Sequence, residues 1–353
     1  MNAAVSAIRP DTTLVGTHLE PTPGATVTID RNRIVGVGTP PPDTEDSVAL
    51  PGTTLVPGFI DAHVHIVLAD PGAVVRGGVT TARDLAWPPH EIWPLVARSQ
   101  SELFKGPLLM AAGQMLTVEG GYPMNAGWAP AETGRVVNGP EDGARAVDDQ
   151  ANAGACVIKV ALNEAAGPTL SADELGAIVR AAHGHGLKVS GHITGLDQLN
   201  KALDAGLDEL AHMLMSDQEI PTPTIARMVE QGVAVVPTLS CRFGSDQDTA
   251  VDNLTGFLRA GGRVVYGTDL GNEGPGPGID EREIAAMARA GMSGHQIIAS
   301  ATVESARWLR LPETGVIAPG ARADLVAVAG DPIADPAALT DVVAVWRGGR
   351  RID

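Results

Sequence analysis

Two histidines that lie one residue apart are the first sign of chemistry in this sequence. His63 and His65 belong to the segment 59–65 (FIDAHVH), directly after the turn residues Pro57 and Gly58. Alternate residues of a β-strand point to the same face, so the two imidazoles can converge on one metal ion. Taken alone, the pair is equally compatible with two exposed histidines on a polar strand.

Four more polar residues fall where short apolar segments end, namely Lys159, His192, His212 and Asp269. If these segments are parallel strands of a barrel, their C-terminal ends meet over one face, which is where barrel active sites lie. Imidazole nitrogens and carboxylate oxygens suit Zn²⁺ and related divalent ions with positions left open for water. A single strand-end histidine is usually a packed core residue, but six convergent groups favour a metal site, in which Asp269 can also serve as a base.

Lys159 is unusual because it is one of four lysines in the chain and lies in an otherwise apolar segment, 157–160. A buried ammonium is costly, and burial shifts the group toward its neutral form. The ammonium has no lone pair with which to bind a cation. If the neutral amine captures CO₂, the resulting carbamate could bridge two metal ions. The alternative is a lysine that pairs with an acidic neighbour.

The middle of the chain alternates short apolar segments with longer helical patterns, which predicts repeated βα units. Ser171 and Glu174 form a capping box at the start of one such helix. The expected strands are 58–65, 79–85, 108–115, 155–162, 187–192, 208–212, 233–239 and 264–269. Eight strands with intervening helices predict an α/β fold, a (β/α)8 TIM-like barrel over residues 56–313.

The two chain ends have a different character, with short alternating runs separated by Gly, Pro and Asp. The runs at 25–29, 33–37, 323–329 and 341–346 predict small antiparallel strands. We expect residues 1–55 and 314–353 to pair into one small β domain.

Composition restricts the partners and the compartment. The net charge is -17 and no block of Lys or Arg interrupts it, so nucleic acid and anionic membrane surfaces are not expected partners. No apolar run is long enough for a membrane span, and residues 1–10 do not resemble a signal peptide. Cys156 and Cys241 lie far apart and are interpreted as buried structural thiols. We therefore expect a cytoplasmic protein with a small-molecule substrate, and the sequence leaves a homo-oligomer open.

Several motifs together resemble those of the amidohydrolase superfamily of metal-dependent (β/α)8 hydrolases. The similarity is strongest to the branch that contains metal-dependent prolidases, zinc carboxypeptidases and imidazolonepropionase-related proteins. The motifs are residues 56–65, 79–85, 157–160, 267–269 and 320–326, and the resemblance covers nearly the whole chain. It implies that the terminal β segments form an accessory β-sandwich beside the barrel.

The resemblance also implies a role for each of the six residues. His63 and His65 resemble the ligands of the more buried metal, and Lys159 resembles an N6-carboxylated bridge. His192 and His212 resemble the ligands of a second metal, and Asp269 resembles an aspartate that binds metal and moves the proton. Two divalent ions, Zn²⁺ with Mn²⁺ or Co²⁺ as alternatives, would then activate a hydroxide for hydrolysis.

The substrate side departs from the family pattern. Thr194 stands where relatives in this branch often carry a second histidine, and the loop 119–128 lacks a Gly-Gly-His sequence, so the resemblance does not assign peptidase specificity. Tyr122 and Trp128 are candidates for substrate contact, with packing on the barrel rim as the alternative. Arg242 is a candidate for binding a carboxylate, with a solvated rim charge as the alternative.

The predicted function is hydrolysis of a carbon–nitrogen bond, amide or peptide-like, in a small molecule by a binuclear metal centre. The same centre could also support ring deamination, lactone cleavage or phosphotriester hydrolysis. A metal-binding scaffold without catalysis is the alternative from outside the enzymes.

Overall fold

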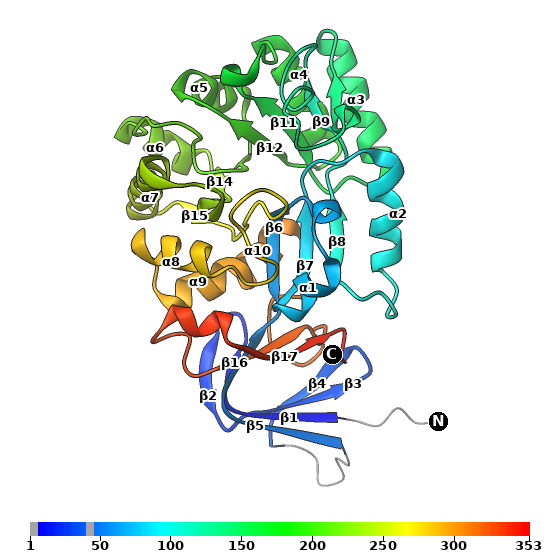
Figure 1. The fold of residues 1–353 in the computed structure, drawn as a ribbon, viewed down its shortest axis with the longest axis vertical. Coiled ribbons are helices and arrows are strands. Elements are labelled where there is room, and N and C mark those ends of the chain that lie inside the picture. Colours follow the sequence, from blue (N-terminus) through cyan, green and yellow to red (C-terminus); the bar gives the residue numbers. More distant parts are fainter. Residues whose placement is uncertain (1–5, 40–45) are drawn as a thin grey trace.

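The computed structural model describes residues 6–39 and 46–353 (Figure 1). Residues 1–5 and 40–45, which belong to the predicted terminal β segment, lie outside the described residues. Within the described residues the strands form three sheets, of eight, seven and three strands. A search of the same residues finds no helix whose length and hydropathy would let it cross a membrane.

The eight-stranded sheet joins the two ends of the chain. Its central contact is the antiparallel pairing of β5 with β16, in which Val56 faces Val326. The four runs predicted as antiparallel strands pair in that way, β3 with β4 and β16 with β17, whereas β1 and β5 run parallel. The chain reaches β5 by way of β2, β3 and β4, and no tight turn forces β1 and β5 to run in opposite directions. The strands are β1 Ser6–Val15, β2 Glu20–Pro23, β3 Thr26–Asp30, β4 Arg33–Gly38, β5 Asp46–Pro57, β16 Leu325–Ala329, β17 Val342–Arg347 and β18 Arg350–Ile352.

The other two sheets contain parallel pairs. The three-stranded sheet consists of β6 Phe59–Val64, β7 Val79–Asp84 and β8 Leu108–Ala111. The seven-stranded sheet has the order β10-β9-β11-β12-β13-β14-β15. Its strands are β9 Met115–Thr117, β10 Gly134–Val136, β11 Ile158–Leu162, β12 Val189–Ile193, β13 Glu209–Leu210, β14 Ala234–Val235 and β15 Arg263–Val264.

One predicted strand, 108–115, is two strands in the structure. β8 pairs with β7, whereas β9 pairs with β11 and belongs to the other sheet. Gly113 lies between them with a φ of +83°, a conformation that favours glycine. A Cβ at Gly113 would also lie 3.0 Å from the ring of Trp93, so a larger residue would require this ring to shift.

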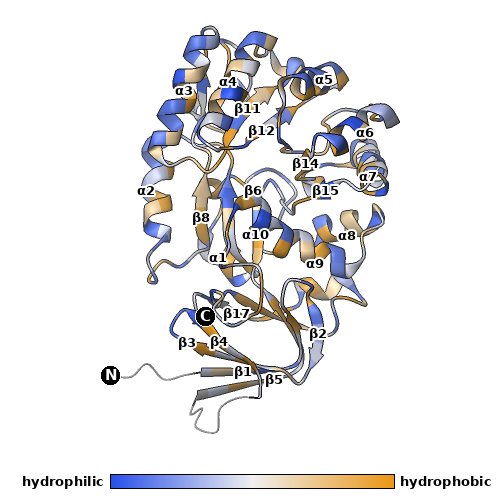
Figure 2. Cartoon of the chain, turned by 180° about the vertical axis from the view of Figure 1, so that it is seen from behind, coloured by the Kyte–Doolittle hydropathy of each residue, from blue (hydrophilic) through white to orange (hydrophobic). Residues whose placement is uncertain are grey.

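Helices alternate with the parallel strands and lie outside them (Figure 1). Polar residues colour much of the outer helices in Figure 2, while the strands that they cover are more apolar. The predicted capping box is present, because Ser171 Oγ accepts a hydrogen bond from Glu174 N and the Glu174 side chain returns to Ser171 N. The helices are α1 Pro71–Arg76, α2 Pro89–Ser99, α3 Pro140–Ala153, α4 Ala172–Gly184, α5 Leu196–Ala205, α6 Thr222–Glu230, α7 Gly244–Arg259, α8 Glu281–Arg289, α9 Gly294–Ala301 and α10 Val303–Leu309.

Backbone hydrogen bonds bring the end of the seven-stranded sheet against β6. The Asp269 N–H donates to His63 O at 2.8 Å, and the His65 N–H donates to Leu270 O at 2.7 Å. Gly267 permits this approach, because a Cβ there would lie only 3.0 Å from His63 N. Residues about 200 positions apart in the sequence therefore lie side by side.

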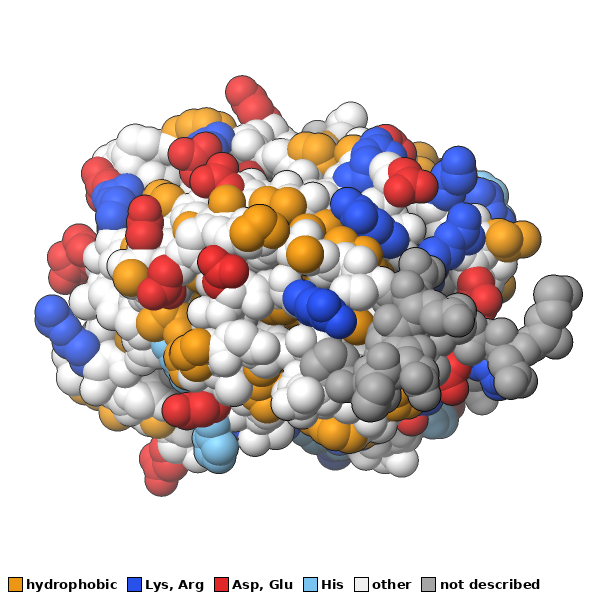
Figure 3. Space-filling view, turned by 90° about the horizontal axis from the view of Figure 1, so that it is seen from below, with side chains coloured by type: hydrophobic (Ala, Val, Ile, Leu, Met, Phe, Trp, Pro, Cys, Tyr) orange, Lys and Arg blue, Asp and Glu red, His pale blue; other side chains and the backbone are white. Residues whose placement is uncertain are grey.

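Acidic side chains are not concentrated on the face that contains the terminal sheet. In the view from below, acidic side chains are scattered among neutral and apolar ones, and several basic side chains lie together toward one side (Figure 3). On this face the negative charge therefore marks no single acidic site.

Candidate metal centre

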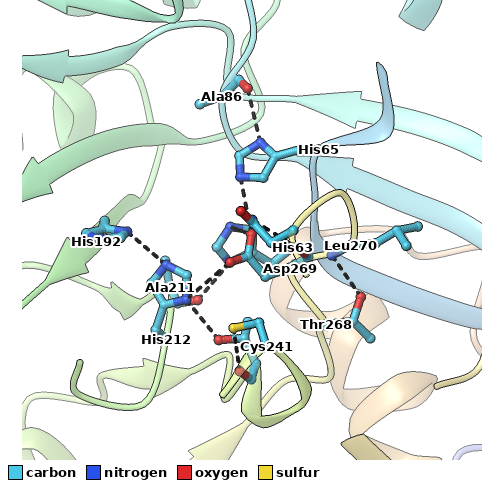
Figure 4. A network of polar contacts seen from close by, with 12 residues as sticks. His63, His65, Ala86, His192, Ala211, His212, Cys241, Thr268, Asp269 and Leu270 are labelled. Carbon is cyan, nitrogen blue, oxygen red and sulfur yellow. Dashed lines mark hydrogen bonds and ion pairs between the residues drawn. The ribbon is translucent and has the colours of Figure 1, made fainter. Parts of the chain in front are cut away.

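His63 lies on β6, His65 directly follows this strand, and both face one carboxylate. Each imidazole places its Nε2 atom 3.2 Å from Oδ1 of Asp269. All three side chains are buried, with at most 9% of each exposed. The alternation of the strand and the bonds between β6 and residues 269–270 produce this group (Figure 4).

His192 and His212 form a second pair beside the first. His192 lies on β12 and His212 follows β13, and their Nδ1 and Nε2 atoms are 3.0 Å apart. His212 Nδ1 is also 3.9 Å from Asp269 Oδ2. Asp269 therefore lies between the two histidine pairs, with one carboxylate oxygen toward each.

Each imidazole is held by its outward nitrogen. His63 Nδ1 contacts Ala211 O at 2.7 Å and His65 Nδ1 contacts Ala86 O at 3.2 Å. A carbonyl oxygen can only accept, so these Nδ1 atoms carry a hydrogen and the Nε2 lone pairs of neutral rings face Asp269. The nitrogens of the second pair that do not face each other also have partners, because His212 Nδ1 contacts Thr238 Oγ1 at 2.8 Å and His192 Nε2 contacts the Asn163 amide at 3.2 Å.

Lys159 lies on β11 with no exposed surface, and its Nζ atom has no hydrogen-bond partner among the described residues. The alternative was a lysine paired with an acidic neighbour, and no hydrogen bond of this kind is present among the described residues. Burial lowers the pKa of Lys159 to about 7, although the charges of Asp269 and Glu209 act in the opposite direction. A substantial share of this amine is thus neutral near pH 7.

The histidines are electrostatically coupled to this lysine. Burial lowers the pKa of His63 and of His192 well below the usual value, and the charge of Lys159 lowers both further. Burial also lowers the pKa of His212, with His192 as the next cause. Burial alone would lower the pKa of His65 too, but the contact with Asp269 and its charge outweigh burial and raise it. Neutral imidazoles are the form that binds a metal ion.

Two buried carboxylates close to the histidines, Asp61 on β6 and Asp84 on β7, were not anticipated from the sequence. Asp61 accepts hydrogen bonds from His63 N and from both N and Oγ1 of Thr268, which ties β6 to the residue before Asp269. Burial raises the pKa of Asp61 to about 7. Asp84 accepts from Ile66 N and Ala86 N, and burial raises its pKa to about 6. The strand alternation contained a signal for Asp61, since it lies two residues before His63.

Thr238 and Cys241 follow β14 and were also not anticipated as site residues. Thr238 is buried and has a φ of +49°, and Asp269 has a φ of +63°. Such backbone conformations in residues other than glycine are uncommon and cluster at functional sites. Cys241 Sγ contacts Thr238 O at 3.0 Å, and burial and the charge of Asp269 raise the pKa of the thiol.

Aromatic side chains from the loop after β9 cover the histidines. The ring of Tyr122 stacks on His192, with centroids 4.4 Å apart and an interplanar angle of 22°. Trp128 lies over His65 with centroids 4.5 Å apart, and its Nε1 atom has no hydrogen-bond partner in the described chain. Burial raises the pKa of Tyr122, so its hydroxyl stays protonated. Both aromatics therefore lie against histidines of the candidate metal centre rather than elsewhere on the rim.

Arg242 is buried, so the alternative of a solvated rim charge is wrong. Its guanidinium donates to Met213 O and Leu214 O and pairs with Asp246 at 3.2 Å. Its Nε atom has no hydrogen-bond partner among the residues described. The guanidinium therefore braces the segment after His212, and one of its donors remains free.

The donor set fits divalent cations. His63, His65 and Asp269 place one ligand atom each within 4.8 Å of the others, and His212, Cys241 and Asp269 do the same. Asp269 Oδ1 is buried and accepts no hydrogen bond from a described residue. Unpaired buried charge is costly, so this carboxylate and the facing imidazole lone pairs are well matched to a metal ion.

Comparison with known proteins decides the family. The sequence profile of the amidohydrolase family matches residues 54–352. The chain belongs to the amidohydrolase family. Members of this family are metal-dependent hydrolases that act on carbon–nitrogen bonds, and this protein is accordingly such a hydrolase.

Relatives of this amidohydrolase span most of its length. An uncharacterized protein of Mycobacterium tuberculosis is 28% identical over 343 residues, covering 85% of each chain. The imidazolonepropionase of Streptomyces griseus is 28% identical and covers 96% of this chain and 94% of its own. Among solved structures, a Xaa-Pro dipeptidase with methionine bound in its active site has a TM-score of 0.83 at 25% identity, covering 98% of this chain and 99% of that one. These likenesses imply a TIM-barrel-like α/β fold.

Proposed function

We propose that this amidohydrolase uses two divalent metal ions to cleave an amide or peptide-like carbon–nitrogen bond in a small molecule. The observation that carries the proposal is the convergence of His63, His65 and His212 on the Asp269 carboxylate, with His192 against His212, beside a buried lysine without a hydrogen-bond partner among the described residues. Zn²⁺ is the proposed ion, with Mn²⁺ and Co²⁺ as alternatives.

Each member of the set has a proposed place. His63, His65 and Asp269 would hold one ion, and His192 and His212 would hold the other. Lys159 would join them as a carbamate, formed when the neutral amine attacks CO₂, a bond forms from Nζ to carbon, and one proton leaves the nitrogen. The pKa of about 7 and the full burial of Lys159 support this reaction, since the neutral amine is available without a competing hydrogen bond.

When bound, the ions supply Lewis acidity and acidify water. The protein residues orient the reactants and move protons. Asp269 accepts a proton from the attacking water on a carboxylate oxygen as the oxygen–carbon bond forms. It then passes that proton to the leaving nitrogen as the carbon–nitrogen bond breaks, so an acid and an amine are released.

The loop aromatics and Arg242 are proposed to contact the substrate. The stacking of Tyr122 on His192 and the position of Trp128 over His65 place apolar surface next to the reacting groups. The free donors, Trp128 Nε1 and Arg242 Nε, are available for a substrate oxygen. We therefore expect substrates with an apolar group close to the scissile bond.

We also propose that the parallel strands close into a (β/α)8 barrel over residues 56–313, with residues 1–55 and 314–353 as an accessory β-sandwich. Hydrogen bonds from Cys156 N to Ala111 O and from Ala62 N to Tyr266 O, both 2.9 Å, support closure at the two gaps between the parallel sheets. A separate buried cluster that includes Ile8 and Leu325 supports the accessory domain.

Metal analysis tests the proposed centre. We expect about two divalent ions per native chain by elemental analysis, and a marked loss of metal in Lys159→Ala. The control is Lys105→Ala, which removes an exposed lysine. Protein supplied with ¹³C-bicarbonate should show a carbamate resonance that disappears in Lys159→Ala alone. A metal-free sample with full activity would overturn the proposal.

A substrate panel tests the reaction. With added Zn²⁺, Mn²⁺ or Co²⁺, we expect turnover of N-acyl amino acids or dipeptides with apolar groups. Lactones, phosphotriesters and aminopyrimidines report the alternative reactions. Turnover of one of these without amide cleavage would replace the proposed reaction, and stoichiometric metal with no turnover would favour a non-catalytic scaffold.

A further inference from the structure

The thiol of Cys241 lies next to His212 and Asp269 of the candidate metal centre, although nothing in the local sequence predicts that it is a ligand. Cys241 ends a short 3-10 helix, Leu239–Cys241, that follows β14. One ligand atom each of His212, Cys241 and Asp269 lies within 4.8 Å of the other two. In Figure 4 the sulfur is drawn between His212 and the segment of Asp269 and Leu270.

Asp269 divides its two oxygens between two donor groups. Oδ1 lies 3.2 Å from Nε2 of His63 and of His65, and Oδ2 lies on the side of His212, 3.9 Å from its Nδ1. The Asp269 side chain is 9% exposed, and Oδ1 accepts no hydrogen bond from the described chain. This buried carboxylate has no hydrogen-bond donor at Oδ1, and its Oδ2 atom is the one directed toward His212, so a cation on that side would compensate the buried negative charge.

We propose that Cys241 is a thiolate ligand for a thiophilic divalent cation that His212 and Asp269 also hold. This inference rests on the proposed metal-dependent function and adds a cation position on the Nδ1 side of His212, separate from the position that His192 Nδ1 and His212 Nε2 face. On binding, the Sγ–H bond breaks, the proton leaves to solvent, and a sulfur–metal bond forms. The Sγ contact with Thr238 O, now 3.0 Å, is exchanged for that bond.

The His212 ring can serve this position from its Nδ1 side. That nitrogen contacts Thr238 Oγ1 at 2.8 Å, and a cation would take its lone pair in place of this hydrogen bond. The opposite nitrogen, Nε2, faces His192 and is the donor for the His192–His212 pair. A thiolate donor makes the position softer, so it should favour Zn²⁺, Cd²⁺ or Co²⁺ over Mn²⁺ or Mg²⁺.

The chain supplies a matched control, because it contains only two cysteines. Cys156 packs beside an apolar cluster of Leu85, Ala112, Val157 and Ala211. It belongs to neither of the ligand groups found among the described residues. Any thiolate–metal signal therefore comes from Cys241 or from Cys156, and single substitutions distinguish them.

Cobalt spectroscopy of the full chain tests the proposal. Metal-free protein is titrated with Co²⁺ while ligand-field bands in the visible and sulfur-to-cobalt charge transfer in the near ultraviolet are recorded. We expect the charge-transfer band in the wild type and in Cys156→Ser, and its loss in Cys241→Ser with the ligand-field bands retained. Circular dichroism of each variant verifies the fold.

Two outcomes separate this inference from the proposed function. Ligand-field bands without charge transfer in the wild type would exclude Cys241 as a ligand and leave the metal centre intact. Failure to bind Co²⁺ at all would overturn both.

Competition between Cd²⁺ and Mn²⁺ is a second measurement. The preference for Cd²⁺ should fall at least about tenfold in Cys241→Ser, and an unchanged preference would count against the inference. If Cys241→Ser does not fold, the ¹¹³Cd resonance of the wild type decides, because a thiolate ligand moves it far downfield of nitrogen- and oxygen-only coordination.

Discussion

Replacing Glu209 by glutamine should lower the free energy of unfolding by about 3–5 kcal/mol. Glu209 lies on β13 with no exposed surface, and its Oε1 atom is 2.6 Å from Arg83 Nη2, whose side chain is 2% exposed. Its other oxygen accepts a hydrogen bond from Trp308 Nε1 at 2.5 Å. Glutamine keeps the size and one acceptor oxygen, so the substitution chiefly leaves the buried charge of Arg83 without its counter-ion.

Burial, and not distance, sets this magnitude. The pair Arg227 and Asp204 has nearly the same separation, 2.7 Å, but its side chains are 34% and 72% exposed. Exposed pairs contribute only about 0–1 kcal/mol because water solvates both partners. Asp204→Asn is therefore the matched control, since it removes the same kind of charge in the same way.

Urea denaturation followed by circular dichroism measures both variants. The midpoint should shift strongly for Glu209→Gln and little for Asp204→Asn. Metal affinity should also fall in Glu209→Gln, because Arg83 Nε donates to Ala62 O at 2.7 Å and so helps to fix the strand next to His63. A loss below about 1 kcal/mol for Glu209→Gln would refute the assignment of this pair as a structural brace.

Three further substitutions test other parts of the site. Thr238→Val removes the hydrogen-bond partner of His212 Nδ1 and should weaken binding of the ion that His192 Nδ1 and His212 Nε2 face by about 10- to 100-fold, measured by competition with a chelator; unchanged affinity would show that the hydroxyl does not orient the ring. Gly267→Ala places a Cβ 3.0 Å from His63 N and should cost about 1–3 kcal/mol with loss of bound metal, and full metal content would contradict the packing. Burial raises the pKa of Glu283 well above 4.5, so the folded protein holds this proton more tightly than the unfolded chain does. The free energy of unfolding therefore falls as the pH rises above 4.5. The stability of Glu283→Gln relative to the wild type should therefore increase between about pH 5 and about pH 8, whereas a flat difference would place the titration elsewhere.

The sequence correctly predicted features that depend only on residue type and on local periodicity. Alternation in the segment 59–65 predicted that His63 and His65 share a face, and both lie beside Asp269 in the structure. The capping box at Ser171 was equally local and is present. The split of the predicted strand 108–115 was missed, because periodicity does not report that Gly113 bends the chain against Trp93.

Contacts between segments that lie far apart in the chain could not be predicted from the sequence. Asp61 could have been found by extending the alternation of its strand, but its bonds to Thr268 join residues 207 positions apart. Cys241 was interpreted as a structural thiol because no nearby residue suggests a ligand, and its neighbours His212 and Asp269 come from other strands. Arg242 was predicted to bind a carboxylate, with a solvated rim charge as the alternative, yet its guanidinium donates to the carbonyls of Met213 and Leu214.

The sequence by itself determined the donor types, their places at strand ends and the family, since these depend on side-chain chemistry and local period. Only the tertiary structure decided which donors share an oxygen of Asp269, which nitrogen of each imidazole is anchored, and that Lys159 has no hydrogen-bond partner among the described residues. The physical reason is that strand register and the packing of the parallel sheets bring together residues more than a hundred positions apart, and burial there changes the pKa values that a sequence alone leaves at their usual range.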